Sequence, residues 1–348
     1  MKFKKSFTMI ELIIVIVIMG ILSNITFDIL SKIYNNYIYT KEINRLNAQL
    51  DNTIEIIAKK MRSRIYNTVI VTAYPSKIGE TDPDKVDFKP ISDLEDGDTK
   101  YTVLEWIGKD QEAKNGMWDF SKNHIQTGWS GFIDLELATR TQNDPKEFNV
   151  TTTDSNFTIV SLIDRNITAS LGYNQDPFDT NTTILIFSGV DMGGDMSPDV
   201  NSSFGWYLDE DRNRSAKTVF AIQDYKEYGD KIDLNITSIT ENNDTTLYAR
   251  YFLSRTAYAI VMVDNNETLE DGTKFNDYNL TFYYNYQPWQ GDWWKDGNST
   301  LLAQHVTEMR FRKDANTPMI RLYMCIQSPF LELNTTRRLT LCKERPVF

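Results

Sequence analysis

The chain has 348 residues, with 48 acidic and 37 basic side chains and a formal net charge of -11. It is long enough to bury one large core or two smaller ones, and its composition is that of an ordinary folded protein. The acidic balance argues against nucleic acid as the main partner, because phosphate contacts need a positive field. Two His and two Cys leave little material for a metal site or a cysteine–histidine nucleophile, so we do not expect an enzyme.

The N-terminus predicts a transmembrane helix. Three lysines within the first six residues precede an apolar run from Phe7 to Phe27. About 20 helical residues span a hydrocarbon core of ~30 Å, so this run can cross a bilayer once. The lysines place the N-terminus in the cytoplasm and the rest of the chain outside. A secretory signal peptide is the alternative, but the run is too long and no A-x-A-like cleavage site follows it.

The segment Ser6-Phe7-Thr8-Met9-Ile10-Glu11-Leu12 resembles the processing motif of the type IV prepilin and pseudopilin family. The resemblance implies that a prepilin peptidase cuts between Ser6 and Phe7, that the new amine of Phe7 is methylated, and that Glu11 pairs with an amine during assembly. Ser6 stands where the family nearly always has Gly. The alternative is a plain single-pass anchor in which Glu11 lies near the membrane interface.

The same resemblance implies a pilin or pseudopilin that is a structural subunit of a type IV pilus or of a type II secretion system filament, which acts in protein transport. Its expected partners are other pilin or pseudopilin subunits, the inner membrane, the peptidase and the filament assembly platform. Before assembly it would be a single-pass inner-membrane protein with its head in the periplasm, and afterwards part of a periplasmic or cell-surface filament. The segments His305–Arg312 and Met319–Cys325 resemble the last strands of large J-type minor pseudopilins and W-type minor pilins.

Beyond the membrane run, apolar residues recur every three or four positions. They form one stripe of an amphipathic helix, made of Ile43, Leu46, Leu50, Ile54, Ile57, Met61 and Ile65. We expect one helix from about Phe7 to about Tyr66, and a short coiled coil is the competing interpretation of the stripe. The predicted division is a leader at 1–6, a membrane or filament-core helix at 7–27, an amphipathic helix at 28–66 and a β-rich head at 67–348.

The rest of the chain is predicted to form an antiparallel sheet. The fold class is therefore α+β and pilin-like, with one long N-terminal helix packed on the sheet and large inserted loops. An insertion-rich centre at about 110–300 is expected to form a second lobe. The expected strands are Thr102–Ile107, Phe132–Leu137, Phe157–Ile163, Thr183–Phe187, Thr218–Ile222, Ile232–Ile236, Tyr258–Val263, Leu280–Tyr286, Val306–Arg312, Met319–Ile326 and Arg338–Cys342.

The Asn-x-Ser/Thr triplets, which are glycosylation acceptor patterns, carry an unexpected signal. Of thirteen triplets, twelve have Asp or Glu two residues before the Asn, whereas acids make up only 48 of 348 residues, so chance predicts about two. The pattern resembles the acceptor sequon of bacterial oligosaccharyltransferases and predicts a glycoprotein; an Asn-, Asp- and Thr-rich surface is the alternative. The exception is Asn24 in the membrane run. The twelve are Asn149, Asn156, Asn166, Asn181, Asn201, Asn213, Asn235, Asn243, Asn266, Asn279, Asn298 and Asn334.

Cys325 and Cys342 fall in the last two expected strands, where an oxidising compartment favours a disulfide bond over two reduced thiols. Two acidic loops, which contain Asp209 and Asp211 and also Asp191 and Asp195, are weak candidates for a structural Ca²⁺; solvated turns are the commoner alternative. No other cofactor is expected.

Three tryptophans, Trp289, Trp293 and Trp294, form either a binding platform or an aromatic loop packed on the sheet. Three function classes remain open: a structural filament subunit, a tip adhesin or uptake receptor that binds through the central insert, and a membrane-anchored enzyme on a pilin-like stalk. The volume of the head favours a minor subunit over a major pilin.

Overall fold

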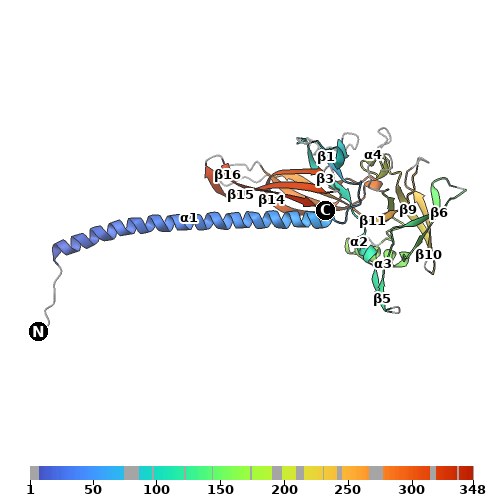
Figure 1. The fold of residues 1–348 in the computed structure, drawn as a ribbon, viewed down its shortest axis with the longest axis horizontal. Helices are drawn as coiled ribbons and strands as arrows, with labels where there is room; N and C mark the ends of the chain where they lie inside the picture. Colours follow the sequence, from blue (N-terminus) through green and yellow to red (C-terminus); the bar gives the residue numbers. More distant parts are fainter. Residues whose placement is uncertain are drawn as a thin grey trace.

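The computed structural model describes residues 8–73, 86–95, 98–120, 123–142, 144–172, 175–189, 198–208, 215–229, 231–240, 245–265, 277–313, 319–334 and 337–347. A single long helix leads into a head built around two β-sheets (Figure 1). The expected α+β class, with a long helix on an antiparallel sheet, is confirmed.

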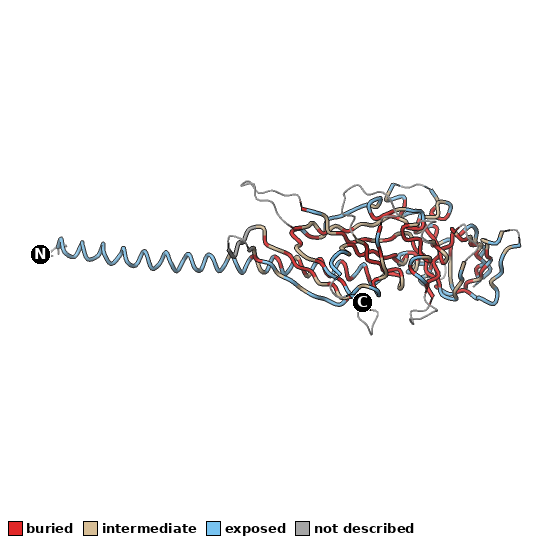
Figure 2. Tube along the Cα trace, turned by 90° about the horizontal axis from the view of Figure 1, so that it is seen from above, coloured by how far each residue is buried: buried red, intermediate tan, exposed pale blue. Residues whose placement is uncertain are grey.

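Helix α1 (Met9–Met61) projects far from the head at its N-terminal end (Figure 1). Its second half carries the predicted stripe, on which Leu46, Leu50 and Ile57 are buried. Residues 9–37 are exposed on every side (Figure 2). The helix stops before Tyr66 because the chain turns back after Met61: the backbone N–H of Ile65 donates to the carbonyl of Ile107 over 2.9 Å.

An eight-stranded antiparallel sheet lies against the second half of α1, in the order β16-β15-β14-β13-β12-β3-β1-β2. Helix α1 contacts β14, β15 and β16 at one end of this order. The strands are β1 (Ile70–Ala73), β2 (Phe88–Pro90), β3 (Tyr101–Ile107), β12 (Ala257–Asp264), β13 (Tyr278–Tyr286), β14 (Asn298–Lys313), β15 (Ile320–Asn334) and β16 (Arg337–Val347), with the short turn η2 (Ile91–Asp93) after β2.

The second sheet has six antiparallel strands in the order β11-β8-β9-β10-β7-β6 and lies at the end of the head away from the N-terminus (Figure 1). Its two outer strands meet at one end, where Phe132 bridges to Arg250 and the N–H of Tyr251 donates to the carbonyl of Gly131 over 2.9 Å. The sheet therefore closes partly into a barrel. The strands are β6 (Ile133–Arg140), β7 (Glu147–Thr153), β8 (Ile184–Phe187), β9 (Val219–Tyr228), β10 (Lys231–Ser238) and β11 (Tyr251–Ser254).

Short elements complete this second lobe, by which we mean residues 109–255. They are α2 (Gln111–Asn115), α3 (Phe157–Ser170), α4 (Val200–Ser203) and the separate hairpin of β4 (Met117–Asp119) and β5 (His124–Gln126). The three-residue turns η3 (Pro288–Gln290) and η4 (Trp294–Asp296) connect β13 to β14 in the first sheet.

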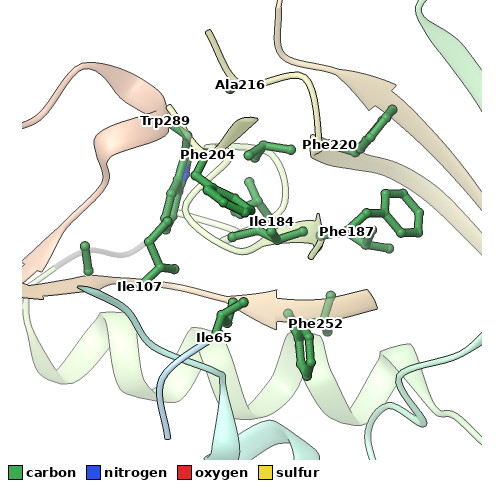
Figure 3. Close-up of a cluster of buried hydrophobic side chains, with 14 of the residues drawn as sticks. Ile65, Ile107, Ile184, Phe187, Phe204, Ala216, Phe220, Phe252 and Trp289 are labelled. Carbon is green, nitrogen blue, oxygen red and sulfur yellow. The ribbon is translucent and has the colours of Figure 1, made fainter. Parts of the chain in front are cut away.

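The two faces of the eight-stranded sheet pack on different partners. In β3, Leu104 and Trp106 join the core with α1, whereas Val103 and Ile107 join the core with the second lobe. Figure 3 shows this second core, where Ile65 and Ile107 lie near Ile184 and Phe204. Strand β3 is thus buried on both faces, which explains its almost continuous apolar sequence.

One strand prediction is wrong, because the segment Phe157–Ile163 is the first half of α3. The side chain of Asn156 caps this helix by accepting from the N–H of Ile159 over 2.9 Å. The buried residues recur at helical spacing, with Phe157, Val160, Asp164 and Thr168 on one face. The β-branched content of the segment favoured a strand, but its cap and spacing are those of a helix.

Candidate functional site

The expected processing residues, Ser6 and Phe7, lie outside the described residues. The described residues begin at Thr8, which is the N-cap of α1, and Glu11 stands at the third helical position. A carboxylate oxygen of Glu11 accepts from the backbone N–H of Thr8 over 3.0 Å and from its hydroxyl over 2.9 Å. This capping box folds the carboxylate back toward the start of the chain, one residue from the expected new amine.

The first half of α1 presents apolar side chains in all directions. Ile10, Val17 and Phe27 are exposed, as are their neighbours along the helix (Figure 2). Within the described part of the chain, α1 is the helix whose length and apolar content would allow it to cross a membrane. Such a surface needs lipid or other apolar helices around it.

The second half of α1 is fixed to the sheet by its apolar stripe and by polar contacts at the edge. The hydroxyl of Ser328 in β15 donates to the carboxylate of Glu42 over 2.6 Å, and Arg45 donates to the same carboxylate over 2.7 Å. The bond from Arg45 is the main cause that lowers the pKa of Glu42. Asp51 pairs with Lys343 and with Arg345 in β16.

Cys325 and Cys342 form a disulfide bond, as their positions predicted. They are direct cross-strand partners in β15 and β16, the strands that cover α1. Closing a loop of this size stabilises a fold by about 3 kcal/mol in the chain-entropy description. The bond therefore secures the sheet where the helix docks.

Nine of the twelve predicted acceptor asparagines lie within the described residues, and Asn213, Asn243 and Asn266 lie outside them. Asn149 and Asn235 are direct partners across β7 and β10, with the Nδ2 of Asn235 donating to the Oδ1 of Asn149 over 3.4 Å. The others are Asn156 at the cap of α3, Asn166 in α3, Asn181 in the turn before β8, Asn201 in α4, Asn279 in β13, Asn298 in β14 and Asn334 in β15.

The weak Ca²⁺ candidates Asp191, Asp195, Asp209 and Asp211 all lie outside the described residues. Over the residues that the structure does describe, no cluster of three His, Cys, Asp or Glu side chains is placed to hold a metal ion. The three tryptophans do not form an exposed platform: Trp289, Trp293 and Trp294 are buried in the core beneath the second lobe.

Two buried polar groups were not anticipated from the sequence. The first is Glu105 in β3, which is fully buried and accepts from the hydroxyls of Thr72 over 2.7 Å, Tyr207 over 2.6 Å and Tyr286 over 3.0 Å. Burial raises the pKa of Glu105. A lone acid inside an apolar strand was the available signal, but its partners come from three distant segments.

The second is an acid pair around Arg255, in the turn that joins the two sheets. Asp110 and Asp164 are buried, and the Nε of Arg255 lies 3.4 Å and 3.1 Å from their carboxylates. Burial, followed by the charge of Asp110, raises the pKa of Asp164 well above its ordinary value. The cluster connects α2, α3 and the start of β12, so it holds the second lobe on the first sheet.

Residues 1–23 match the family model described as the prokaryotic N-terminal methylation motif. No curated protein and no solved structure matches the chain. The motif supports a chain of the type IV prepilin kind: a structural subunit that is processed by prepilin peptidase, anchored in a membrane before assembly and assembled with other pilin subunits.

Proposed function

We propose that this protein is a minor pilin or pseudopilin, cut between Ser6 and Phe7 and built into a type IV pilus or type II secretion filament through the first half of α1. The observation that carries the proposal is the exposed apolar surface over residues 9–37, directly after the methylation motif. Once the subunit leaves the membrane, equivalent helices of neighbouring subunits are the surface that can cover this one.

Glu11 sets the axial register in this proposal. Its carboxylate already accepts two bonds at the helix start, from the backbone and side chain of Thr8. In a filament core of low dielectric, an unpaired carboxylate is costly and a neighbour's terminal amine offsets that cost. Subunits that place the amine of Phe7 beside this carboxylate are therefore favoured over misaligned ones.

The size of the head favours a minor, tip or priming subunit. The residues that the structure describes after 67 form a head with two large sheets, and a filament made only of such heads would be crowded. The resemblance of His305–Arg312 and Met319–Cys325 to the last strands of J-type and W-type subunits supports a subunit of that kind. The lysines before the apolar run support an N-terminus in the cytoplasm and a head in the periplasm before assembly.

The test replaces Glu11 with Ala in the full chain and compares it with Asp28→Ala, another acid on the exposed half of the helix. We expect both variants to be cut before Phe7, as N-terminal sequencing would show. Glu11→Ala should be depleted from isolated filaments, whereas Asp28→Ala should not. Cleavage at another bond, or normal assembly of Glu11→Ala, would contradict the proposal.

A tip adhesin or uptake receptor is the second candidate, and the separate hairpin of β4 and β5 supports it. Trp118 and Ile125 are cross-strand partners there and are 48% and 58% exposed, and Phe120 is 89% exposed. An exposed apolar patch of this kind often marks an interaction site. Trp118→Ser should then reduce adhesion or uptake by the cells without changing filament number; unchanged adhesion and uptake would exclude this role.

The acid-containing sequons support glycosylation of the head by an oligosaccharyltransferase. Twelve of the thirteen Asn-x-Ser/Thr triplets have an acid two residues before the Asn, which is far more than chance predicts. Glycans would also keep an exported β-rich head soluble. Added mass on the intact native protein, removed when the transferase is deleted, is the expected result.

A further inference from the structure

Among the sequons whose side chains the structure describes, four have part of their recognition sequence buried in the folded head. We call these the closed sequons and name them by their acceptors, Asn166, Asn181, Asn201 and Asn279. A transferase that reads the acid two residues before the Asn and the hydroxyl two residues after it must contact both side chains. Burial of either one prevents that contact in the folded protein.

The sequon of Asn166 is divided by helix α3. Residues two before and two after a helical position both point to the opposite face, because each step along the helix turns by 100°. Asn166 is exposed, whereas Asp164 is fully buried and Thr168 is 5% exposed. The hydroxyl of Thr168 also donates to the carbonyl of Asp164 over 2.9 Å. The acceptor thus faces solvent while both recognition side chains face the core.

One buried hydrogen bond closes two sequons at once. The hydroxyl of Thr183 donates to the carboxylate of Asp164 over 2.6 Å, and both side chains are fully buried. Asp164 is the acid of the Asn166 sequon, and Thr183 is the hydroxyl of the Asn181 sequon. The acid before Asn181, Asp179, is exposed, so this sequon is closed only at its hydroxyl.

The other two closed sequons follow the same principle. Ser203, the hydroxyl of the Asn201 sequon, is 4% exposed, although Asp199 and Asn201 are exposed. Asp277, the acid of the Asn279 sequon, is buried and bonded to the Nδ2 of Asn265 over 2.8 Å and to the Nδ1 of His305 over 3.0 Å.

Among the described residues, we call two sequons open because both of their recognition side chains are exposed in the folded head. Around Asn298, the acid Asp296, the acceptor and the hydroxyl of Thr300 are all exposed. Around Asn156, Asp154 and Thr158 are exposed, and the cap of α3 uses the Oδ1 of Asn156, not the Nδ2 to which a glycan is attached.

The acceptors and their flanking residues differ in burial. None of the eight acceptors with a described side chain is buried, but five of their sixteen flanking acids and hydroxyls are. The final fold therefore leaves space for a glycan at sites that it does not allow an enzyme to read. In the Asn181 sequon, the acid Asp179 is exposed but the hydroxyl of Thr183 is fully buried, so the two cannot be read together in the folded head.

We propose that the glycan is transferred to the closed sequons before the head folds, which deepens the glycosylation proposed above and depends on it. The donor is an oligosaccharide joined to a membrane lipid through pyrophosphate. A bond forms between the Asn Nδ2 and C1 of the first sugar, and the bond from C1 to the pyrophosphate oxygen breaks. The lipid pyrophosphate leaves with the electron pair, and the proton lost from Nδ2 goes to solvent.

The first test maps occupancy on the full-length native protein by mass spectrometry of its peptides. We expect Asn166 and Asn181 to carry glycan at a level within about twofold of Asn156 and Asn298. Glycan at the two open sequons with less than a tenth of that level at the closed ones would overturn transfer before folding, but not glycosylation. Absence of glycan at every site would overturn the glycosylation itself.

The second test uses the folded full chain from cells without a transferase, kept in detergent micelles. A purified bacterial oligosaccharyltransferase and a lipid-pyrophosphate oligosaccharide should modify Asn156 and Asn298 in this protein and leave Asn181 unmodified. A synthetic peptide of residues 177–185 should be modified, which would show that the fold and not the local sequence blocks the site. Modification of Asn181 in the folded chain would overturn the proposal.

A variant tests in cells whether the transferase reads the acid of a closed sequon. If the transferase reads the unfolded chain, Asp179→Ala should remove the glycan from Asn181 and leave the glycans at the other sites in place. The matched control is Glu136→Ala, another exposed acid that belongs to no sequon. Unchanged occupancy of Asn181 in Asp179→Ala would contradict the proposal.

Discussion

The two faces of the eight-stranded sheet are held in different ways. The face against α1 is apolar, and its charged contacts, from Glu42 and Asp51, lie at the edge of the helix. The face toward the second lobe buries Glu105 among three hydroxyls, and the Arg255 cluster lies at the joint between the two sheets.

This difference indicates how each contact tolerates change. An apolar face loses stability roughly in proportion to the area that a substitution removes. A buried charge cluster contributes little net stability when complete but becomes very unfavourable when one member is missing. We therefore expect substitutions in the contact with α1 to lower stability by amounts that follow the apolar area removed. In the contact with the second lobe, the loss of any one charged member should lower stability strongly.

The largest effect should come from Arg255→Leu. The change leaves Asp110 and Asp164 buried without their cation, which costs about 3–5 kcal/mol in comparable buried pairs. The measurement is the free energy of unfolding of the full chain in detergent, by urea titration. The control is Arg165→Leu, which removes an exposed pair with Asp176 and should change the free energy of unfolding by about 0–1 kcal/mol. Equal losses in the two variants would contradict the difference between the faces.

A somewhat smaller loss should follow from Leu50→Ala on the helix face. Leu50 is fully buried in the stripe, and truncation of a buried Leu costs about 2–5 kcal/mol. Leu12→Ala is the matched control, because Leu12 lies in the exposed half of the same helix and should leave the unfolding transition of the head in place. A change of equal size in both variants would mean that the stripe does not anchor the head.

The pH dependence of the free energy of unfolding should also distinguish the two faces of the sheet, and Glu105 lies on the face toward the second lobe. Because its pKa is raised in the folded state, its contribution to stability is complete below the ordinary pKa of 4.5 and is lost as pH rises through the folded-state pKa. Glu105→Gln should remove this fall in the free energy of unfolding, which begins as pH rises above the ordinary pKa of 4.5. Glu55→Gln, an exposed acid on α1, is the control and should retain it.

Glu42 on the helix face should behave with the opposite sign and the smallest effect. Its pKa is lowered, so its contribution is present above the ordinary pKa of 4.5 and is lost as pH falls through the folded-state pKa. Glu42→Gln should flatten the acid side of the stability profile below about pH 5 and leave the neutral side unchanged. A loss confined to neutral pH would show that the sign is wrong.

Local patterns predicted most of this architecture. The stripe of α1 follows from helical spacing, and ten of the eleven expected strand segments overlap strands that the structure describes. The exception is Phe157–Ile163, whose β-branched residues favour a strand, whereas the cap Asn156 and the helical spacing of its buried residues favour the helix that forms. Boundaries such as the end of α1 depend on where the chain turns back onto β3, which is a tertiary effect.

The site could be predicted only where it is local. The prediction for Glu11 and those for the sequons depend only on neighbouring residues. The pairing of Cys325 with Cys342 was predicted from the order of the last strands. The partners of Glu105 come from β1, the segment after α4 and β13, and the bond between Asp164 and Thr183 joins a helix to the residue before a strand. No pattern along the chain marks such contacts, because they depend on how distant elements pack.

Both margins of the eight-stranded sheet are poorly suited to accept a strand from outside. At one margin β2 has three residues and ends in Pro90, which lacks an N–H; at the other, β16 carries Lys343, Glu344 and Arg345 followed by Pro346. Backbone hydrogen bonding with a strand of another chain is therefore unfavourable at both margins. A neighbouring subunit that contacts either margin will therefore do so through side chains, and point substitutions can change such a contact without disturbing the backbone hydrogen bonds of the sheet.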